Sequence, residues 1–206
     1  EKAVSTLTKG IEFLFKKNKV THFQGLASFI SANKISIIDS KKNTNTIETE
    51  KTVICTGSEP MSLPKIKFDE KKIISSTGAL SLKEVPKKML VIGGGYIGLE
   101  MGSVWSRLGS NVEVIEFLDH ITPGMDNEIS KEFLKILQKQ EIKFHLETKV
   151  ENIIKKNASI LVKTSNKEGK KKDFECDVVL IAVGRKPNTK NLNLEKIGVN
   201  LNEKMK

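Results

Sequence analysis

Three glycines and one acidic residue are the part of this 206-residue chain best suited to chemistry. Gly93, Gly95 and Gly98 form a G-x-G-x-x-G pattern that begins at the last residue of the apolar run MLVIG, and Glu116 follows 18 positions after Gly98 (98 to 116). Such glycines permit a tight turn, the close approach of a pyrophosphate to the backbone, and close packing of a helix on a strand. A carboxylate at the end of the next strand can accept hydrogen bonds from a ribose diol. The spacing predicts a dinucleotide site, against the alternative of a structural glycine turn in an unrelated α/β protein.

Glu116 also indicates which dinucleotide binds. A carboxylate repels the 2′-phosphate of NADP, and an NADP site needs an arginine or lysine close by. After Glu116 the next basic side chain, apart from His120, is Lys131. We therefore expect NAD rather than NADP.

The cysteines and histidines offer no second reactive site. Cys55 and Cys176 have neither the spacing of a redox pair nor that of metal ligands, and both lie at or beside apolar runs, so we expect buried thiols. His22, His120 and His145 are scattered along the chain, and no pair has ligand spacing on one helix. We expect no metal site.

An alternation of strand and helix patterns from residue 86 onward can position the dinucleotide site. Continuous apolar runs, typical of parallel strands covered on both faces, occur in MLVIG, NVEVIE and DVVLIAVG. Helices are expected from about Tyr96 to Leu108 and after a capping Asp126, and IKFHL indicates a further strand. Residues 150–175 have the pattern of a small antiparallel meander. These elements predict an α/β fold, with a Rossmann-like domain that combines a parallel sheet and a small antiparallel meander.

The chain before residue 86 has a different pattern. Residues 3–17 place apolar side chains at helical spacing, which predicts a helix with one buried stripe. VTHFQGLASFI, KISII and NTIETEKTVICTG predict an antiparallel meander, in which TVICTG is a buried strand that ends at Gly57. The segment SEPMSLPKIKFDE, with its prolines, predicts an irregular linker.

Composition narrows the functional classes. The formal net charge is +10, but the lysines are spread along the chain, and their densest group, Lys167 with 170–172, lies at an expected hairpin turn without interleaved aromatic residues. We therefore expect a solvated surface rather than nucleic-acid binding. No apolar run approaches the roughly 20 residues needed to span a bilayer, so we expect no membrane association. The first residues, EKAVSTLTKG, have no signal-peptide pattern and no initiator Met and open inside an expected helix, which suggests a fragment.

The motifs ICTGSEP, SSTGALSLKEVPKKMLVIGGGYIGLEMGSVWSRLGSNVEVIEF and VGRKPNT, in this order, resemble those of the pyridine nucleotide–disulfide oxidoreductases. STGALSL and GSVWSRLG favour the branch of this family that oxidises dihydrolipoyl groups in 2-oxo acid dehydrogenase complexes. The resemblance implies a partial FAD-binding domain at residues 1–82, an NAD-binding domain at 83–184 and a connector at 185–206. Another FAD/NAD disulfide reductase, an NADH oxidase and a stand-alone NAD-binding module are the alternatives that stay open.

The resemblance also assigns binding residues by position. The implied NAD set is Gly93, Gly94, Gly95, Tyr96, Ile97, Gly98, Leu99 and Glu100 at the pyrophosphate, Glu116 at the adenosine ribose, Val150 beside the adenine and Gly184 beside the nicotinamide half. The implied FAD set is Gly25, Thr56, Gly57 and Ser58. In the family, an acid at the position of Glu100 pairs with a lysine beside the flavin ring. Some relatives place a side chain that gates the nicotinamide pocket at the position of Tyr96, and packing of this tyrosine on a neighbour is an equal alternative.

The family passes electrons from a dithiol through a redox-active disulfide and FAD to NAD, and this chain matches only part of that path. The disulfide needs C-x-x-x-x-C, which Cys55 and Cys176 cannot supply, and no histidine here has a glutamate partner at the family's spacing. We therefore expect no catalytic residue in this chain, NAD binding as its contribution, and no catalysis by the chain alone. The resemblance implies that the whole protein is a homodimer. It also implies that the whole protein binds lipoyl domains and other components of 2-oxo acid dehydrogenase complexes, in a bacterial cytoplasm or a mitochondrial matrix.

Overall fold

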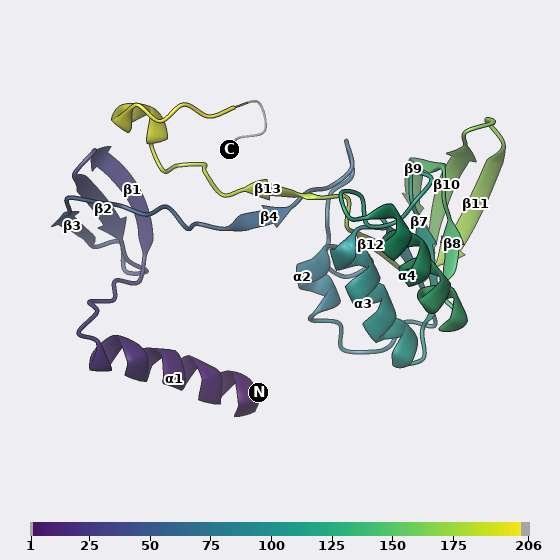
Figure 1. The fold of residues 1–206 in the computed structure, drawn as a ribbon, viewed down its shortest axis with the longest axis horizontal. Coiled ribbons are helices and arrows are strands. Elements are labelled where there is room, and N and C mark those ends of the chain that lie inside the picture. Colours follow the sequence, from purple (N-terminus) through teal and green to yellow (C-terminus); the bar gives the residue numbers. More distant parts are fainter. Residues whose placement is uncertain (1, 203–206) are drawn as a thin grey trace. The chain divides into compact units, whose positions relative to one another are not determined.

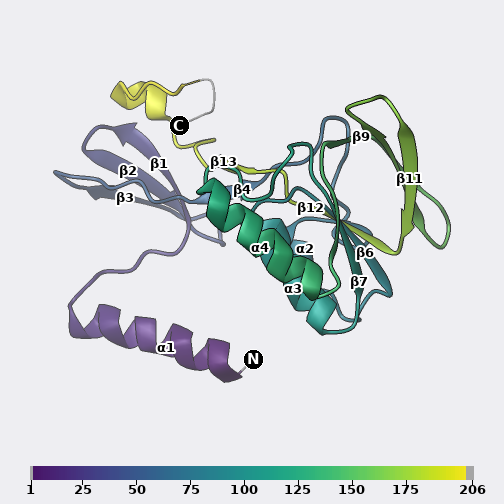
Figure 2. The same cartoon turned by 45° about the vertical axis from the view of Figure 1, so that its right-hand side comes forward.

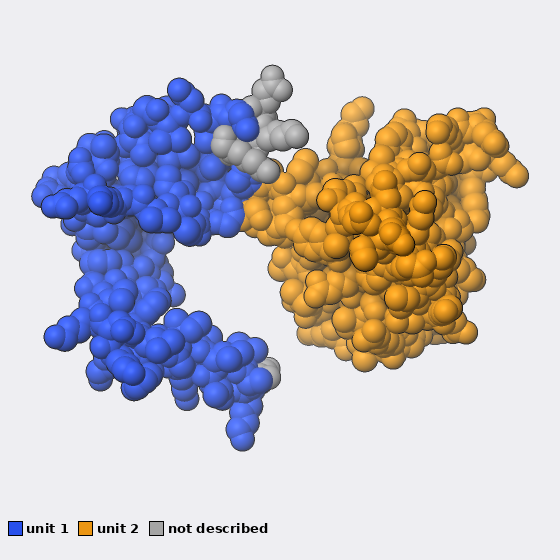
Figure 3. All heavy atoms as spheres, viewed as in Figure 1, with its two compact units in different colours: residues 1–57, 187–206 blue, residues 58–186 orange. Residues whose placement is uncertain are grey.

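The computed structural model describes residues 2–202 and divides the chain into two compact units. The first unit consists of residues 1–57 and 187–206, and the second of residues 58–186 (Figure 3). Residue 1 and residues 203–206, which end the expected connector, lie outside the described residues. The functional division at residues 82 and 184 stays a prediction. Its N-terminal boundary differs from that of the second unit because residues 73–74 form a strand of that unit's sheet.

A five-stranded parallel sheet forms the centre of the second unit (Figure 1). Its order is β5-β12-β6-β7-β8, and every neighbouring pair is parallel. The strands are β5 (Ile73–Ile74), β6 (Lys88–Ile92), β7 (Asn111–Ile115), β8 (Lys143–His145) and β12 (Val178–Ile181). The apolar runs MLVIG, NVEVIE and DVVLIAVG thus form the buried strands that the sequence predicts. Their carboxyl ends share one edge of the sheet, where parallel α/β sheets bind ligands.

Both faces of this sheet are covered, which explains why its strands are apolar throughout. Helices α2 (Ser76–Ala79), α3 (Tyr96–Arg107) and α4 (Asn127–Lys139) lie on one face (Figure 2). On that face Val91, Val112 and Val114 are buried in one apolar cluster with Leu99 of α3. Each fully buried aliphatic side chain contributes roughly 1.5–3 kcal/mol to stability. The predicted cap of α4 is confirmed, because the Asp126 carboxylate accepts hydrogen bonds from the backbone at 128 and 129.

An antiparallel meander covers the opposite face. It consists of β9 (Thr148–Lys155), β10 (Ile160–Asn166) and β11 (Lys171–Cys176), in the order β11-β10-β9. Leu90 and Ile115 of the parallel sheet pack with Val162 and Phe174 of the meander in a second apolar cluster. Strand residues alternate between the two clusters, as the period of a β-strand requires.

The first unit contains helix α1 (Lys2–Lys17), the antiparallel meander β1 (Leu26–Ser31), β2 (Lys34–Ile38) and β3 (Thr44–Glu48), and a 3₁₀ helix, η1 (Leu194–Ile197). Its small core joins Phe29 of β1 to Leu192 and Leu194. Two short strands, β4 (Ser58–Pro60) and β13 (Arg185–Pro187), pair where the chain passes from one unit to the other.

Two expectations for the first unit are wrong. Helix α1 forms as predicted, but it has no buried residue, and Leu7 and Ile11 of its apolar stripe are more than half exposed. Residues 52–57, TVICTG, form no strand in the described structure, and Val53 is exposed. In both cases the sequence pattern indicates apolar side chains, whereas burial requires a second surface that covers them. A strand also needs a neighbour for its backbone hydrogen bonds, and no described strand pairs with residues 52–57.

Candidate functional site

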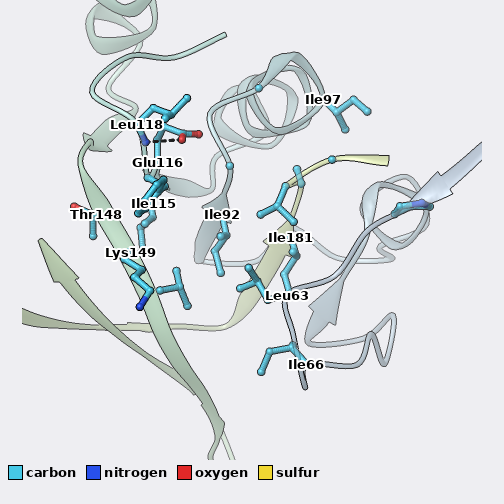
Figure 4. Close-up of a pocket in the computed structure, with 18 of the residues that line it drawn as sticks. Leu63, Ile66, Ile92, Ile97, Ile115, Glu116, Leu118, Thr148, Lys149 and Ile181 are labelled. Carbon is cyan, nitrogen blue, oxygen red and sulfur yellow. Dashed lines mark hydrogen bonds between the residues drawn. The ribbon is translucent and has the colours of Figure 1, made fainter. Parts of the chain in front are cut away.

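A cavity of about 1010 Å³ opens at the carboxyl ends of β6, β7 and β12, within the second unit (Figure 4). Its lining comes from the glycine turn after β6, the segment after β7, the first half of β9, the end of β12, and residues 60–66. Apolar side chains such as Ile92, Ile115 and Ile181 line its interior. A largely apolar cavity of this size with a few polar groups is typical of a cofactor site.

The three glycines of the turn differ in what surrounds them. Gly93 has φ +107, and a Cβ there would lie 2.4 Å from the carbonyl oxygen of Ala182, which directly follows the neighbouring strand β12. A Cβ on Gly98 would lie 2.3 Å from the Gly93 carbonyl oxygen, so only glycine allows α3 to lie this close to β6. A Cβ on Gly95 would meet no atom within 4 Å. The turn is therefore tight on its protein side and open on its cavity side at Gly95.

Helix α3 begins directly after this open position. Gly95 is its N-cap residue, no side chain caps the helix, and no acidic residue lies in its first turn. The free backbone N–H groups and the positive end of the helix dipole favour an anion there. A pyrophosphate fits this position, and the open space in front of Gly95 allows it to approach the backbone.

The Glu116 carboxylate is held in place by two backbone donors. The residue is only 8% exposed, although it lines the cavity. Its Oε2 accepts a hydrogen bond of 2.6 Å from the Gly94 N–H, and its Oε1 accepts one of 2.8 Å from the Leu118 N–H. Figure 4 shows the bond to Leu118. A carboxylate can accept about four hydrogen bonds, so further acceptor positions are available to the hydroxyls of a ribose.

The structure brings together only part of the implied NAD set. The members that line the cavity are Gly93, Gly95, Tyr96, Ile97, Glu116, Val150 and Gly184. Gly94 lies behind the turn, where a Cβ would be 3.2 Å from Glu116 Oε2. Gly98 and Leu99 are buried residues of α3, and Glu100 of the same helix is exposed; none of the three lines the cavity. Contact of each with NAD stays a prediction.

Several lining residues were not expected from the sequence. Leu63 and Ile66 come from the expected linker, and Thr122 comes from the irregular segment after β7. The topology was the signal that could have revealed Thr122, because loops that follow the carboxyl ends of neighbouring parallel strands meet at one edge. No local pattern indicates that Leu63 and Ile66 fold back over that edge.

One basic side chain near Glu116 also comes from a distant part of the sequence. Lys149, on β9, lines the same cavity. Its Nζ lies 3.3 Å from a carboxylate oxygen of Glu151, so its charge is partly compensated. Its distance from Glu116 along the sequence gives no sign that it lines the same cavity.

The four implied FAD residues do not line the cavity, and most of their polar atoms are used within the protein. Thr56 Oγ1 donates a 2.7 Å hydrogen bond to the carbonyl oxygen of Asn188. Ser58 Oγ accepts one of 2.7 Å from Arg185 Nε. A Cβ on Gly25 would lie 2.6 Å from a carbonyl oxygen of β2, so this glycine serves packing. These residues alone do not form an FAD cradle, and their contact with FAD stays a prediction.

The two cysteines lie in different surroundings. Cys176 is buried, as expected, and burial raises the pKa of its thiol to about 12, so it is a poor nucleophile at neutral pH. Cys55 is exposed, so the expectation of a buried thiol was wrong there; it lies in residues 52–57, which form no strand. Among residues 2–202, no group of His, Cys, Asp and Glu side chains is placed to hold a metal ion. The helices described over the same range are all too short or too polar to cross a membrane.

Comparison with known proteins gives matches over nearly the whole chain. The sequence profile of the pyridine nucleotide-disulphide oxidoreductase family matches residues 2–206. The chain is 51% identical over 202 residues to the mitochondrial dihydrolipoyl dehydrogenase of Dictyostelium discoideum, covering 97% of this chain and 41% of that protein. It is 53% identical over 206 residues to a dihydrolipoamide dehydrogenase of Chaetomium thermophilum, covering 99% of this chain and 41% of that protein. The chain thus spans about two fifths of the length of these relatives.

A solved structure has the same fold. The crystal structure of LpdA from Mycobacterium tuberculosis superposes with a TM-score of 0.87 at 21% identity, and the match covers 98% of this chain and 44% of that one. This likeness confirms the predicted α/β fold class with its parallel sheet and antiparallel meanders.

Proposed function

This chain belongs to the pyridine nucleotide-disulphide oxidoreductase family, and from that premise we propose that it is the NAD-binding part of a dihydrolipoamide dehydrogenase. Members of this family use FAD and NAD. The identities of 51% and 53% to dihydrolipoyl and dihydrolipoamide dehydrogenases support this activity. The whole protein would oxidise a dihydrolipoyl group to a lipoyl group while NAD is reduced to NADH.

The observation that carries the NAD-binding proposal is the pairing of an open phosphate position with a fixed carboxylate at one sheet edge. Gly95 leaves free space at the positive end of α3, and the Glu116 carboxylate lies at the end of the adjacent strand. The pyrophosphate would lie at Gly95 and the adenosine ribose at Glu116. When bound, NAD supplies a two-electron hydride acceptor.

The same carboxylate favours NAD over NADP. It is held by the N–H groups of Gly94 and Leu118, so it cannot easily turn away from a 2′-phosphate. Lys149, a basic residue that lines the same cavity, pairs with Glu151. Repulsion between the carboxylate and the phosphate would weaken NADPH binding.

The described residues offer no group for the dithiol chemistry itself. Cys55 and Cys176 are free cysteines, and the raised pKa of the Cys176 thiol makes it unreactive. We therefore assign the redox-active disulfide and the proton-accepting base to parts of the protein outside this chain. The chain alone would bind NAD without catalysing the reaction.

The partners and compartment of the whole protein follow from its relatives as proposals. Its substrate would be the dihydrolipoyl group on the lipoyl domains of 2-oxo acid dehydrogenase complexes, and the whole protein would be a homodimer. Relatives named as mitochondrial support the mitochondrial matrix more than a bacterial cytoplasm as its compartment.

Isothermal titration calorimetry on the purified chain tests NAD binding. NADH is expected to bind, and NADPH to bind at least about tenfold more weakly, because a charge repulsion of about 1.4 kcal/mol corresponds to that factor. A chain that binds neither cofactor would refute the proposal, and equal affinities for both would refute the role of Glu116.

A further inference from the structure

Thr122 has an unusual backbone conformation at the edge of the cavity. Its φ is +50, and among the described non-glycine residues with positive φ it is the only β-branched one and the only buried one, at 4% exposure. A β-branched side chain disfavours this conformation, and the ring of the following Pro123 restricts the residue further. Such strain persists only where surrounding contacts impose it, and it is concentrated at functional sites.

The contacts that impose it run from α4 to the glycine turn. The Thr122 side-chain hydroxyl is hydrogen-bonded to that of Ser130 on α4 at 2.7 Å, and Ser130 is buried as well. The Thr122 N–H donates a 2.8 Å hydrogen bond to the Gly94 carbonyl oxygen. The Gly94 N–H in turn donates to Glu116 Oε2. Four residues from three separate segments therefore form one hydrogen-bonded chain.

This chain of contacts determines the orientation of one peptide unit of the turn. The carbonyl of Gly94 and the N–H of Gly95 belong to the same peptide, and no cis peptide bond occurs among the described residues. In a planar trans peptide these two groups point in opposite directions. Because Thr122 holds the carbonyl, the Gly95 N–H is directed away from Thr122. Gly95 is also the position where the turn is open on its cavity side.

We propose that Thr122 is a positioning residue for cofactor binding: its N–H orients the Gly94–Gly95 peptide so that the Gly95 N–H can donate to the pyrophosphate, and its hydroxyl bond to Ser130 maintains the strained backbone that this requires. The inference rests on the NAD-binding function proposed above. Thr122 acts through the turn, and Ser130 supports it without lining the cavity.

The test compares NADH affinity in four variants of the purified chain by calorimetry. Thr122→Val removes the hydroxyl but keeps the β-branched shape, and Ser130→Ala removes its partner outside the cavity. Each is expected to weaken NADH binding by about tenfold, the factor that one hydrogen bond commonly represents. Thr122→Ser keeps the hydroxyl and should retain wild-type affinity. In the double variant Thr122→Val with Ser130→Ala, the loss should be little larger than in either single variant, because both act on one contact.

Thr164→Val is the matched control. Thr164 is also a buried threonine, and its hydroxyl donates a 2.7 Å hydrogen bond to the carbonyl oxygen of Lys172 within the meander. Its loss should lower thermal stability without changing NADH affinity. An effect of Thr122→Val no larger than that of Thr164→Val would overturn the proposal. Should Thr122→Val not fold, the affinity of Ser130→Ala decides in the same way.

A spectroscopic measurement separates orientation from general loosening. In the wild-type chain, the amide proton resonance of Gly95 should shift on NADH addition, as expected for a new hydrogen bond to phosphate. In Ser130→Ala that shift should be smaller at saturating NADH, and an unchanged shift would contradict the proposal. Failure of the wild-type chain to bind NADH would instead refute the proposed function, which distinguishes the two inferences.

Discussion

The Gly94 N–H donates a 2.6 Å hydrogen bond to Glu116 Oε2, so the acid expected at the ribose is built into the turn expected at the phosphates. The second oxygen of the same carboxylate accepts from the Leu118 N–H. Glu116 thus has two functions that a single substitution would affect together: it supports the turn, and it presents a negative charge to the ligand. Substitutions that remove only the charge can separate these functions.

Glu116→Gln should reduce the preference for NADH over NADPH. The amide keeps an oxygen that can accept from Gly94 or Leu118, so the turn should persist, whereas the repulsion of the 2′-phosphate is lost. We expect NADPH affinity to rise by about tenfold and NADH affinity to fall by a smaller factor. Calorimetry with both cofactors measures the two changes.

Glu132→Gln, on the exposed face of α4, serves as the control with the same chemistry. An unchanged ratio of the two affinities in Glu116→Gln would show that the carboxylate does not discriminate.

Gly95 and Gly98 offer a second matched pair, because the same added methyl group meets different surroundings. Gly95→Ala should fold normally, since its φ of −76 suits any residue and a Cβ there meets no atom within 4 Å. It should nevertheless weaken NADH binding by about tenfold or more, because the methyl group occupies the space of the pyrophosphate.

Gly98→Ala should instead lower the stability of the fold. Its Cβ would lie 2.3 Å from the Gly93 carbonyl oxygen, so α3 must move away from β6. We expect the free energy of unfolding to fall by about 1–3 kcal/mol, the usual range for overpacking. Denaturant unfolding and NADH titration of both variants check the pair. Wild-type NADH affinity in Gly95→Ala would place the phosphates elsewhere.

The glycine turn, Glu116 and the Asp126 cap were predictable because each depends on residues close together in the sequence. The turn, its helix and the acid lie within residues 93–116, and the cap acts on its own first turn. The residues that were missed reach the cavity through tertiary structure. Lys149 lies on the meander and Leu63 in the expected linker, and no local spacing in the sequence indicates that either lines the cavity.

The errors in the first unit have the same origin. The apolar stripe of α1 and the run TVICTG give the correct local composition for burial, yet the described structure supplies no surface that covers them. The exposure of Cys55 follows from the second of these errors. Sequence patterns indicate which face is apolar, whereas the covering surface is a property of the tertiary fold.

Beneath the meander, the Glu113 carboxylate on β7 contacts a lysine and a histidine on the two neighbouring strands of the parallel sheet. Its Oε2 lies 2.7 Å from His145 Nε2, and its Oε1 lies 3.1 Å from Lys88 Nζ. Burial by itself raises the pKa of Glu113, but the hydrogen bonds to His145 and Lys88 outweigh it and lower the pKa from its ordinary value of 4.5.

This lowered pKa predicts acid sensitivity with a definite sign. The unfolded chain binds the proton at higher pH than the folded one, so the contribution of Glu113 to stability is complete above about pH 4.5 and is lost as the pH falls through the lowered folded value. Glu113→Gln should therefore lower the free energy of unfolding by about 1–3 kcal/mol at pH 7, and its difference from wild type should shrink below pH 4.5. Urea unfolding from about pH 3 to about pH 7, which includes the upper part of the range where the contribution of a paired carboxylate is lost, measures this difference. Glu132→Gln removes an exposed carboxylate, so its stability should follow the wild-type curve. A difference between Glu113→Gln and wild type that stays constant over the whole pH range would show that packing, and not the charge of Glu113, stabilises this contact.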